Sequence, residues 1–381
     1  MTAVHMQKQV YRMLTINPGS TSTKISLFEN DTEIQKEELL IDAGKIQDCL
    51  LMIDQLELRM QSIRAFIEKS GINVRNLDMI VARGGSINGV KSGAYMINEH
   101  IDTVLRYAPR SQHVSSLAGI IAYQMSIEYG VPAMFYDGVS ADDADEIMHY
   151  TGLPECRRFV TSHCLNSKMV AREAAEKLGK RYEDCDIITA HLGGGITMAF
   201  HHGGRMIDTL LDDAGPMSPQ RAGRIPVTDV INLCYSGKYT KAEMANKMRG
   251  KGGLVAYFGV NDVREVLKLA DEGDQRAKDI LGYMCYQIAK GIGELAVCQS
   301  GKLDCIILTG GMAYAAELME QIAERVRFLA PVIVIPGERE MQAMARGGLR
   351  ILTGEEEPKE YTWYPPEYGS YEEFRARVTA K

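Results

Sequence analysis

The segment NPGSTSTK, residues 17–24, combines one glycine, several hydroxyl side chains and a lysine, a mixture typical of phosphate binding. A Walker loop would need two glycines that bracket four residues, followed by Lys-Ser or Lys-Thr and a helix. Here Gly19 stands alone and Lys24 is followed by Ile25. The segment is therefore no Walker loop, and a phosphate site in it must have a different structure.

Residues on both sides of Pro18-Gly19 alternate between apolar and polar, over residues 14–16 and again over residues 25–27. Such alternation predicts β-strands, and the proline-glycine pair predicts a tight turn. We expect a β-hairpin with its tip at residues 17–23. An ordinary polar turn has the same composition, but this tip would offer phosphate oxygens its backbone N–H groups and polar side chains. These side chains are Asn17, Ser20, Thr21, Ser22 and Lys24.

A second hairpin of the same kind is predicted over residues 185–200, CDIITAHLGGGITMAF. An apolar strand leads through His191 into Gly193, Gly194 and Gly195, after which the alternation resumes. Three consecutive glycines let the backbone approach a ligand with no Cβ in the way. Two similar hairpins half a chain apart indicate two related domains that face one cleft.

A third glycine turn, in residues 305–326, differs in kind. Its apolar strand passes through Gly310 and Gly311 into a helical pattern with Leu318, Ile322 and Val326 on one face. A strand that enters a helix through glycines is suited to binding a nucleotide at the helix N-terminus.

The ordered motifs NPGSTSTK, HLGGG and LTGG resemble those of the acetate and butyrate kinases, within the actin-like ATPase superfamily. The resemblance covers nearly the whole chain, and the Pro-Gly-Ser-Thr-Ser form is typical of the butyrate kinase branch. It implies an α/β fold of two ribonuclease-H-like domains with a central nucleotide cleft. The first domain would be residues 1–155, with residues 349–381 packing back on it, and the second, nucleotide-binding domain would be residues 156–348.

The same resemblance implies a phosphotransferase that uses ATP or ADP with Mg²⁺ and converts a short-chain carboxylate, such as butyrate or isobutyrate, to an acyl phosphate. It also implies a homo-oligomer of at least two copies. A carboxylate acceptor is already ionised at neutral pH, since its reference pKa is about 4. Such an enzyme needs no general base, so its side chains must position the reactants and cancel negative charge.

Cationic side chains for this task stand at two places. Arg83 ends an apolar strand before two glycines, and Arg221 lies in a loop dense with turn residues, close to Arg224. By resemblance, Arg83 and Arg221 hold the substrate carboxylate and the moving phosphoryl group; surface arginines are the alternative. His163, in TSHCLN, resembles a histidine that stabilises this phosphoryl group, and whether it does so or orders a hinge stays open.

Two acids are the Mg²⁺ candidates that the resemblance implies. Asp137 follows an apolar strand and precedes a glycine, and Glu340 follows an Ile-Pro-Gly turn. Mg²⁺ prefers few protein carboxylates together with waters and phosphates. Asp142, Asp143 and Asp145 are alternatives to Asp137, and Glu340 has the alternative role of a carboxylate favoured by a helix dipole.

The nucleoside contacts are also implied by the resemblance. Asp262 corresponds to a ribose-contacting aspartate and Arg264 to its adenosine neighbour, although an aspartate that serves a helix macrodipole would look the same. Gly310, Gly311 and Met312 would line the adenine pocket. His191 and the glycines after it would contact phosphate.

Helical patterns separate the strands that position these residues. One helix is expected over residues 54–71 with Asp54 as N-cap and Gly71 as stop, and others over residues 164–179 and 277–301. Thr240 and Glu243 form a capping box. MIVARGG and PAMFYDG read as buried strands, and residues 154–158 as a hinge.

Composition excludes several classes of function. The 381 residues are 45% hydrophobic and carry a net charge of −7 without a long basic run, which argues against nucleic acid as a partner. No apolar stretch approaches the roughly 18 residues of a membrane span, and the first residues lack a signal-peptide core. The eight scattered cysteines form no C-x-x-C pair, which favours reduced thiols in a cytoplasmic protein.

Two other functions fit parts of the pattern. A sugar or polyol kinase of the same fold would need an ionised acid to accept a hydroxyl proton, and Asp137 is available for it. A non-catalytic, nucleotide-gated protein of the actin or chaperone type would hydrolyse ATP without a carboxylate substrate.

Overall fold

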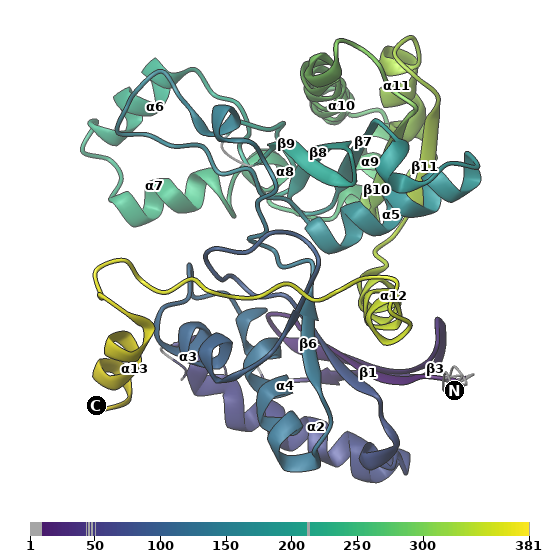
Figure 1. Ribbon diagram of the computed structural model, residues 1–381. Coiled ribbons are helices and arrows are strands. Elements are labelled where there is room, and N and C mark those ends of the chain that lie inside the picture. The colour runs from purple at the N-terminus through teal and green to yellow at the C-terminus, as the bar shows by residue number, and fades with distance from the viewer. Residues whose placement is uncertain are drawn as a thin grey trace. The chain divides into compact units, whose positions relative to one another are not determined.

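The computed structural model describes residues 10–380 apart from residues 43, 45, 47, 48, 50, 212 and 213. It contains two compact units (Figure 1). The first runs up to Ala141 and includes Arg339–Lys381, and the second is Asp142–Glu338. The sequence had suggested boundaries after residues 155 and 348.

Side-chain contacts explain where the chain changes unit. Asp143 pairs with Lys168 at 3.9 Å and Asp145 with Arg205 at 3.1 Å, so the segment after Ala141 belongs with the second unit. Helix α12 (Glu340–Leu352) belongs with the first, because it packs on strands of that unit. Such pairings between distant residues leave no local pattern in the sequence.

The first unit is built on a six-stranded sheet of order β3-β2-β1-β4-β6-β5. The hairpin β1–β2 is antiparallel, as predicted. Its strands extend further than expected, because Asn17 pairs with Lys24 and Pro18 with Thr23, so the turn is shorter than the predicted tip of residues 17–23. Strands β1, β4 and β6 are parallel, so their carboxyl ends share one edge of the sheet. The strands are β1 (Arg12–Pro18), β2 (Ser22–Glu29), β3 (Thr32–Leu40), β4 (Met79–Arg83), β5 (Ala94–Met96) and β6 (Ala133–Tyr136).

Helices cover both faces of this sheet (Figure 1). α12 packs on β1, β4 and β6, while α4 (Ser116–Tyr129) packs on the same strands from the other side, beside α2 (Leu56–Ser70) and α3 (Glu99–Tyr107). α2 ends at Gly71, as predicted, in a left-handed conformation with φ 68°. The predicted N-cap Asp54 is wrong: Gln55 holds that position, because residues Met52–Gln55 form a separate 3-10 turn.

The second unit repeats the arrangement with the order β11-β10-β7-β8-β9. Strands β7, β8 and β9 form an antiparallel meander, and β7, β10 and β11 are parallel, as β1, β4 and β6 are in the first unit. The second predicted hairpin is therefore present as β7–β8. The strands are β7 (Ile187–Leu192), β8 (Ile196–His202), β9 (Arg205–Leu210), β10 (Cys305–Gly310) and β11 (Val332–Pro336).

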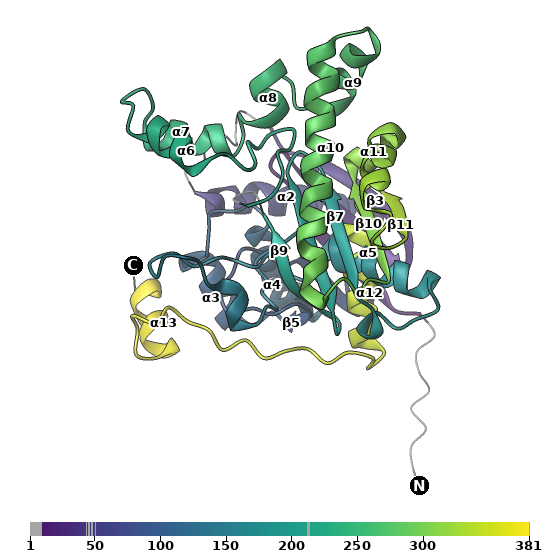
Figure 2. The ribbon, with the colours of Figure 1, turned by 90° about the horizontal axis from the view of Figure 1, so that it is seen from above.

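Alternate residues of these strands supply two separate cores. Ile306 and Leu308 pack with α10 (Gln275–Ala296), and Ile307 packs on the opposite face with α5 (Cys164–Lys177). Figure 2 shows α10 running along the sheet with α11 (Ala316–Val326) beside it. The remaining helices of this unit are α6 (Val227–Cys234), α7 (Lys241–Met248), α8 (Gly253–Phe258) and α9 (Val263–Asp271); the capping box at Thr240 is present.

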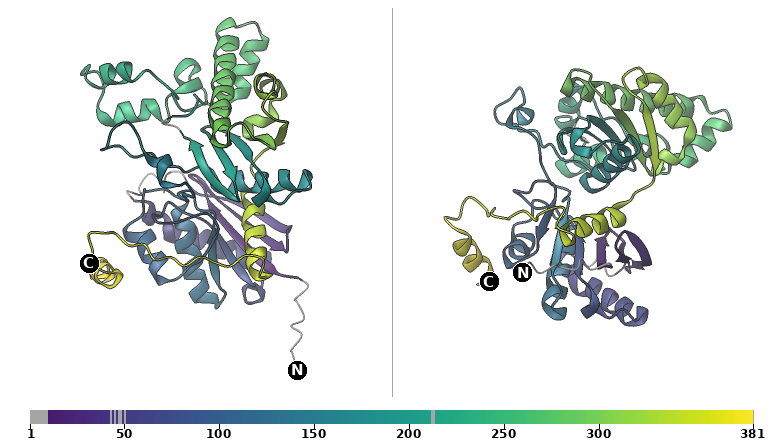
Figure 3. Two further views of the ribbon diagram at one scale, coloured as in Figure 1. Left: turned by 45° about the horizontal axis from the view of Figure 1, so that its top comes forward. Right: turned by 45° about the vertical axis from the view of Figure 1, so that its right-hand side comes forward.

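The residues after α12 run across the first unit to α13 (Tyr371–Thr379) (Figure 3). Lys359 donates its amide to Ala94, Tyr361 donates its hydroxyl to Asn88, and the carbonyl of Trp363 contacts His100. Burial of these aromatic side chains explains why so acidic a tail is ordered.

Two expectations about the whole chain can be compared with the structure. Within the residues described, no helix is both long enough and apolar enough to cross a membrane. The eight cysteines are free thiols.

Candidate active site

The tip of the β1–β2 hairpin presents its amide groups outward. Gly19 N donates to Ser22 O at 2.7 Å and closes the turn, while Ser20 and Thr21 are exposed. No described residue accepts a hydrogen bond from the amide N–H of Ser20 or Thr21. Ser22 is buried and donates its hydroxyl to Glu38 at 2.6 Å, so this predicted ligand group is engaged within the sheet. Lys24 is the cross-strand neighbour of Asn17, so the two side chains share a face.

Asn17, Arg83 and Glu340 form a closed triangle at the carboxyl edge of the first sheet. Arg83 Nη2 lies 2.9 Å from Glu340 Oε1, and Arg83 Nη1 donates to Asn17 Oδ1 at 3.2 Å. Asn17 Nδ2 in turn donates to Glu340 Oε2 at 2.7 Å. The side chains of Arg83 and Glu340 are only 16% and 10% exposed, so solvent screens their attraction weakly.

One donor of this triangle has no partner. Arg83 Nε is buried and makes no hydrogen bond with any described residue. A buried N–H on a cation is expensive to leave unsatisfied, so Arg83 Nε is a candidate donor to an oxygen atom of a ligand. His113 is a neighbour that the sequence analysis missed: desolvation first, and then the charge of Arg83, lower the pKa of its imidazole.

Asp137 follows β6 at the same edge and is held in an unusual conformation. Its φ of 44° lies in the left-handed region, which costs free energy for a non-glycine residue. Asp137 Oδ1 accepts from Gly93 N at 2.8 Å, and Asp137 N donates to Gly93 O at 3.0 Å. The side chain is 2% exposed. A methyl group on Gly84 would lie 2.6 Å from Gly138 N, so the strand ends that carry Arg83 and Asp137 approach closely.

The acids of this unit are compatible with a Mg²⁺ ion that keeps its water shell. Both carboxylate oxygens of Glu340 already have partners, Asn17 and Arg83. Across the described residues, no cluster of three or more His, Cys, Asp or Glu side chains is placed to hold a metal. Mg²⁺ in proteins binds through one or two carboxylates together with waters and phosphate oxygens, and Glu340 and Asp137 offer groups of that type. Asp142, Asp143 and Asp145 are engaged elsewhere, by His149, Lys168 and Arg205.

In the second unit, the glycine turn after β7 packs against the loop that carries Arg221. Ser218 Oγ and Gln220 N both donate to Gly194 O, at 2.8 and 3.0 Å. A methyl group built on Gly195 would lie 2.5 Å from Arg221 Nη2 and 2.6 Å from its Nε. Gly195 therefore lets the guanidinium group lie directly on the backbone. Arg224 pairs instead with Glu294 and with Ala214 O.

His163 and His191 stack face to face, with ring centroids 4.1 Å apart and planes inclined by 13°. His163 precedes α5 and contacts Thr197 Oγ1 through Nδ1 at 2.9 Å. Asn166 Nδ2 donates to His191 Nδ1 at 3.1 Å, which leaves the proton of a neutral His191 on Nε2. That nitrogen lies 3.5 Å from Glu338 Oε1.

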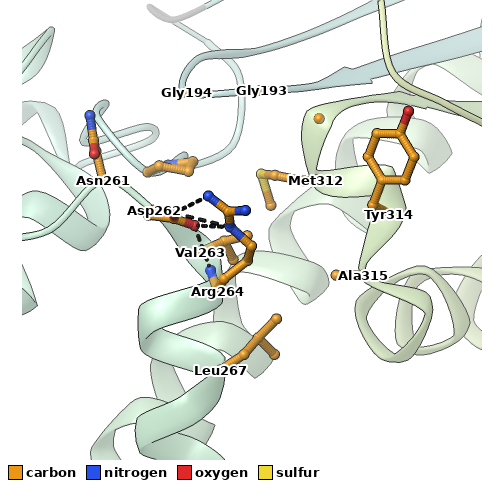
Figure 4. A pocket seen from close by; sticks show the side chains of 12 residues that line it. Gly193, Gly194, Asn261, Asp262, Val263, Arg264, Leu267, Met312, Tyr314 and Ala315 are labelled. Carbon is orange, nitrogen blue, oxygen red and sulfur yellow. Dashed lines mark hydrogen bonds and ion pairs between the residues drawn. The ribbon is translucent and has the colours of Figure 1, made fainter.

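A pocket of about 670 Å³ lies beside the same glycine turn (Figure 4). This volume is in the range of small-molecule sites. Figure 4 shows Met312 and Tyr314 on one side and Asn261 on the other, with Arg264 between them. The lining includes the predicted residues Gly193, Gly194, Asp262, Arg264, Gly311 and Met312, together with Pro219, Asn261, Val263, Leu267, Tyr314 and Ala315.

Asp262 has the capping role that the sequence left open. It is the N-cap of α9 and accepts from Arg264 N at 2.9 Å. Its carboxylate also receives Arg264 Nε and Nη2, at 2.9 and 2.5 Å. These hydrogen bonds, that of the guanidinium first, lower the pKa of Asp262 to about 2.

Gly310 has a packing role. Its φ is 93°, and a methyl group there would lie 2.5 Å from Leu192 O, so this turn packs against the end of β7. Gly311 has open space where its side chain would be and lines the pocket. Tyr314 and Asn261 were missed because an isolated polar or aromatic residue in a loop gives no signal of its own.

Comparisons with known proteins bear on the whole chain. The model of the acetokinase family matches residues 149–357. Butyrate kinase 2 of Clostridium acetobutylicum is 42% identical over 353 residues, which cover 92% of this chain and 99% of that protein. The probable butyrate kinase 2 of Caldanaerobacter subterraneus is also 42% identical, over 92% of this chain and 100% of that protein.

Solved structures agree on the fold. The acetate kinase of Porphyromonas gingivalis superimposes with a TM-score of 0.74 at 19% identity, over 90% of this chain and 100% of that one. A propionate kinase from Francisella tularensis gives 0.70 at 20% identity, over 88% and 98%. The predicted fold class, two α/β domains of the actin-like ATPase type, is confirmed. With identity to curated relatives far above 30% across almost its full length, the chain belongs to the acetokinase family.

Proposed function

We propose that this protein transfers a phosphoryl group reversibly between ATP and a short-chain carboxylate, butyrate or a branched analogue, and forms an acyl phosphate. The observation that carries the proposal is the 42% identity to two butyrate kinases over 92% of the chain. The Arg83 guanidinium of the first unit supports it, because Arg83 Nε makes no hydrogen bond with any described residue and a cationic donor suits an anionic substrate.

The nucleoside of ATP would occupy the 670 Å³ pocket. Met312 and Gly311 offer an apolar surface for the base, and Asp262 would accept hydrogen bonds from the ribose. Because Asp262 is ionised at any physiological pH, it is an acceptor throughout. The exposed amides of Ser20 and Thr21, with Gly19, Asn17 and Lys24, would bind phosphate oxygens; Gly193, Gly194 and His191 would do so in the second unit.

The carboxylate of the acid would bind Arg83. Its buried Nε has no partner among the described residues, and a carboxylate oxygen would satisfy it. Arg83 is already fixed by Glu340 and Asn17, so it can bind the acid without losing further conformational freedom. Mg²⁺, held by Glu340 and Asp137 through its waters, would neutralise phosphate charge when bound.

Arg221 and the histidine pair would stabilise charge on the transferring group. Arg221 lies on the backbone of the glycine turn and offers a planar set of donors suited to phosphoryl oxygens. His163 is the outer partner of a stacked pair whose inner member, His191, is 2% exposed. Holding these donors in place before the reaction lowers the barrier, since no reorganisation is needed.

The test is a hydroxamate assay. Enzyme, MgATP and hydroxylamine are incubated with each acid from acetate to isovalerate, and hydroxamate formation reports the acyl phosphate. We expect the highest rate with a four- or five-carbon acid. Arg83→Ala should raise the KM for the acid, and Arg221→Ala should lower kcat by about 10²-fold, the size of effect seen for one lost oxyanion donor. Absence of hydroxamate with every acid of two to five carbons would reject the proposal, and ADP release that depends on glucose or glycerol would favour a sugar kinase.

We also infer assembly into at least a dimer, from resemblance to the family, and a cytoplasmic location, from the scattered cysteines without a C-x-x-C pair. Light scattering of the purified protein tests the first, and fractionation of the source cell the second.

A further inference from the structure

Arg59 is a fully buried arginine whose side chain has 0% exposure. It stands in the first turn of α2 and reaches the underside of the β1–β2 hairpin. Arginine is rarely so buried unless its charge is paired, and no described carboxylate pairs with this one. Burial lowers the pKa of its guanidinium to about 10, which still leaves it charged at neutral pH.

Neutral acceptors surround the guanidinium group, and most belong to the hairpin tip. Nη1 donates to Ser22 O at 2.9 Å and to Thr23 Oγ1 at 2.8 Å. Nη2 donates to Gly19 O at 2.9 Å. Gln55, the N-cap of α2, accepts from both Nε and Nη2, at 3.2 and 2.8 Å, and so fixes the plane of the group.

These bonds set the direction of the peptide groups in the tip. The carbonyls of Gly19 and Ser22 point inward to Arg59, and that of Thr21 accepts from Ile41 N at 2.9 Å. With its carbonyls held inside, the turn leaves the N–H groups of Ser20 and Thr21 on the exposed side. Successive outward N–H groups of this kind form an anion-binding concavity.

We propose that Arg59 is a positioning residue for ATP: it holds the carbonyls of the Gly19–Ser22 turn inward and places a buried positive charge beneath the N–H groups that bind the polyphosphate. It touches no substrate and acts through the turn. The proposal rests on the proposed function of this hairpin. A buried cation whose partners among the described residues are all neutral is costly for stability alone, which favours a functional reason for keeping it.

The test compares Arg59→Met and Arg59→Lys with a matched control, Arg64→Met. Arg64 lies on the same helix but is exposed and pairs with Glu128. Equilibrium binding of ATP and of adenosine is measured for each variant, with kcat, KM for ATP and KM for butyrate. We expect Arg59→Met to weaken ATP binding about tenfold or more and to leave adenosine binding and the KM for butyrate within twofold of the parent protein.

Arg59→Lys separates charge from geometry. Lysine keeps the charge but cannot bridge Gly19 O and Ser22 O with a planar fork. We therefore expect ATP affinity between those of the parent and the methionine variant. Arg64→Met should change neither affinity.

Three results would contradict the role proposed for Arg59 or for the hairpin. If Arg59→Met lowers the melting temperature but leaves ATP binding within twofold of the parent, Arg59 is a structural brace and the inference is wrong. Equal losses for ATP and adenosine would also contradict it. If the methionine variant does not fold, Gln55→Leu, which removes the side chain that orients the guanidinium, must show the same selective loss for ATP. A parent protein that binds no ATP would instead refute the proposed function.

Discussion

Replacing Gly195 by alanine should move Arg221 and slow catalysis without unfolding the protein. The φ of Gly195 lies outside the left-handed region, so alanine can adopt its backbone conformation. The added methyl group would lie 2.5 Å from Arg221 Nη2 and 2.6 Å from Nε, whereas ordinary contact begins at 3.4 Å. Since the three atoms nearest to the new methyl group all belong to the guanidinium group of Arg221, that group is what must shift, by about 1 Å.

The size of the effect follows from that displacement. A misplacement of about 1 Å in a positioned catalytic group can cost about 10²-fold in rate, which corresponds to about 2.7 kcal/mol of transition-state stabilisation. We therefore expect kcat of Gly195→Ala to fall by about 10²-fold in the hydroxamate assay. Adenosine binding should stay within twofold of the parent protein, because the pocket is lined by Gly193 and Gly194 and not by Gly195.

Two comparisons make this prediction specific. Gly293→Ala is the matched control: it lies in α10 with no atom within 4 Å of the new methyl group, so it should leave kcat unchanged and raise helix stability by about 1 kcal/mol. In an Arg221→Ala background, Gly195→Ala should have no further effect, because the group it displaces is gone. A kcat within threefold of the parent, or fully additive effects in the double variant, would refute the contact as the cause.

Three further predictions concern charge and pH. Glu340→Gln should lower kcat at least about tenfold and weaken the apparent Mg²⁺ affinity in a titration of the hydroxamate assay, because it removes the buried partner of Arg83. The pKa of Asp262 is about 2 against an ordinary 3.8, so its carboxylate stabilises the folded state above pH 3.8 and loses that effect as pH falls through 2. We therefore expect the difference in the free energy of unfolding between Asp262→Asn and the parent protein, measured in urea, to vanish over this pH range. Burial lowers the pKa of His201 to about 3 against an ordinary 6.5, so below pH 6.5 the unfolded chain binds a proton that the folded chain does not. The free energy of unfolding should therefore fall as pH drops from 6.5 to 3. In urea unfolding of His201→Gln, this free energy should fall less steeply with pH over the same range.

Local patterns were sufficient to predict the two hairpins. Alternation on both sides of a turn specifies two antiparallel strands, and the observed pairs Ile16 with Ile25 and Leu192 with Ile196 agree with it. An apolar run that ends in a charged residue and a glycine likewise placed Arg83 and Asp137 at strand ends. These predictions succeeded because each depends on residues that are neighbours in the chain.

Contacts between residues far apart in the sequence could not be predicted from such local patterns. Asn17 and Glu340 are 323 residues apart, and nothing near either predicts their hydrogen bond. The sequence analysis did not single out Arg59, since a helical stripe shows which face is buried but not what a charged residue on it contacts. The glycines of the second hairpin were assigned to ligand approach, whereas the structure gives Gly195 a contact with Arg221.

The two hairpins place a cation differently at equivalent positions of a repeated fold. In the first, a cation lies behind the turn and binds its carbonyls, so its effect on a ligand passes through the orientation of Ser20 and Thr21. In the second, the cation lies on the backbone at Gly195, and we expect its guanidinium group to contact a ligand directly. A cation behind the turn acts equally on the ground state and the transition state and therefore changes affinity. A cation that meets the transferring group acts more strongly in the transition state and changes kcat. Substitutions at Arg59 and at Gly195 should thus separate into binding and rate effects, and variants that changed both parameters alike would show that the two turns do the same task.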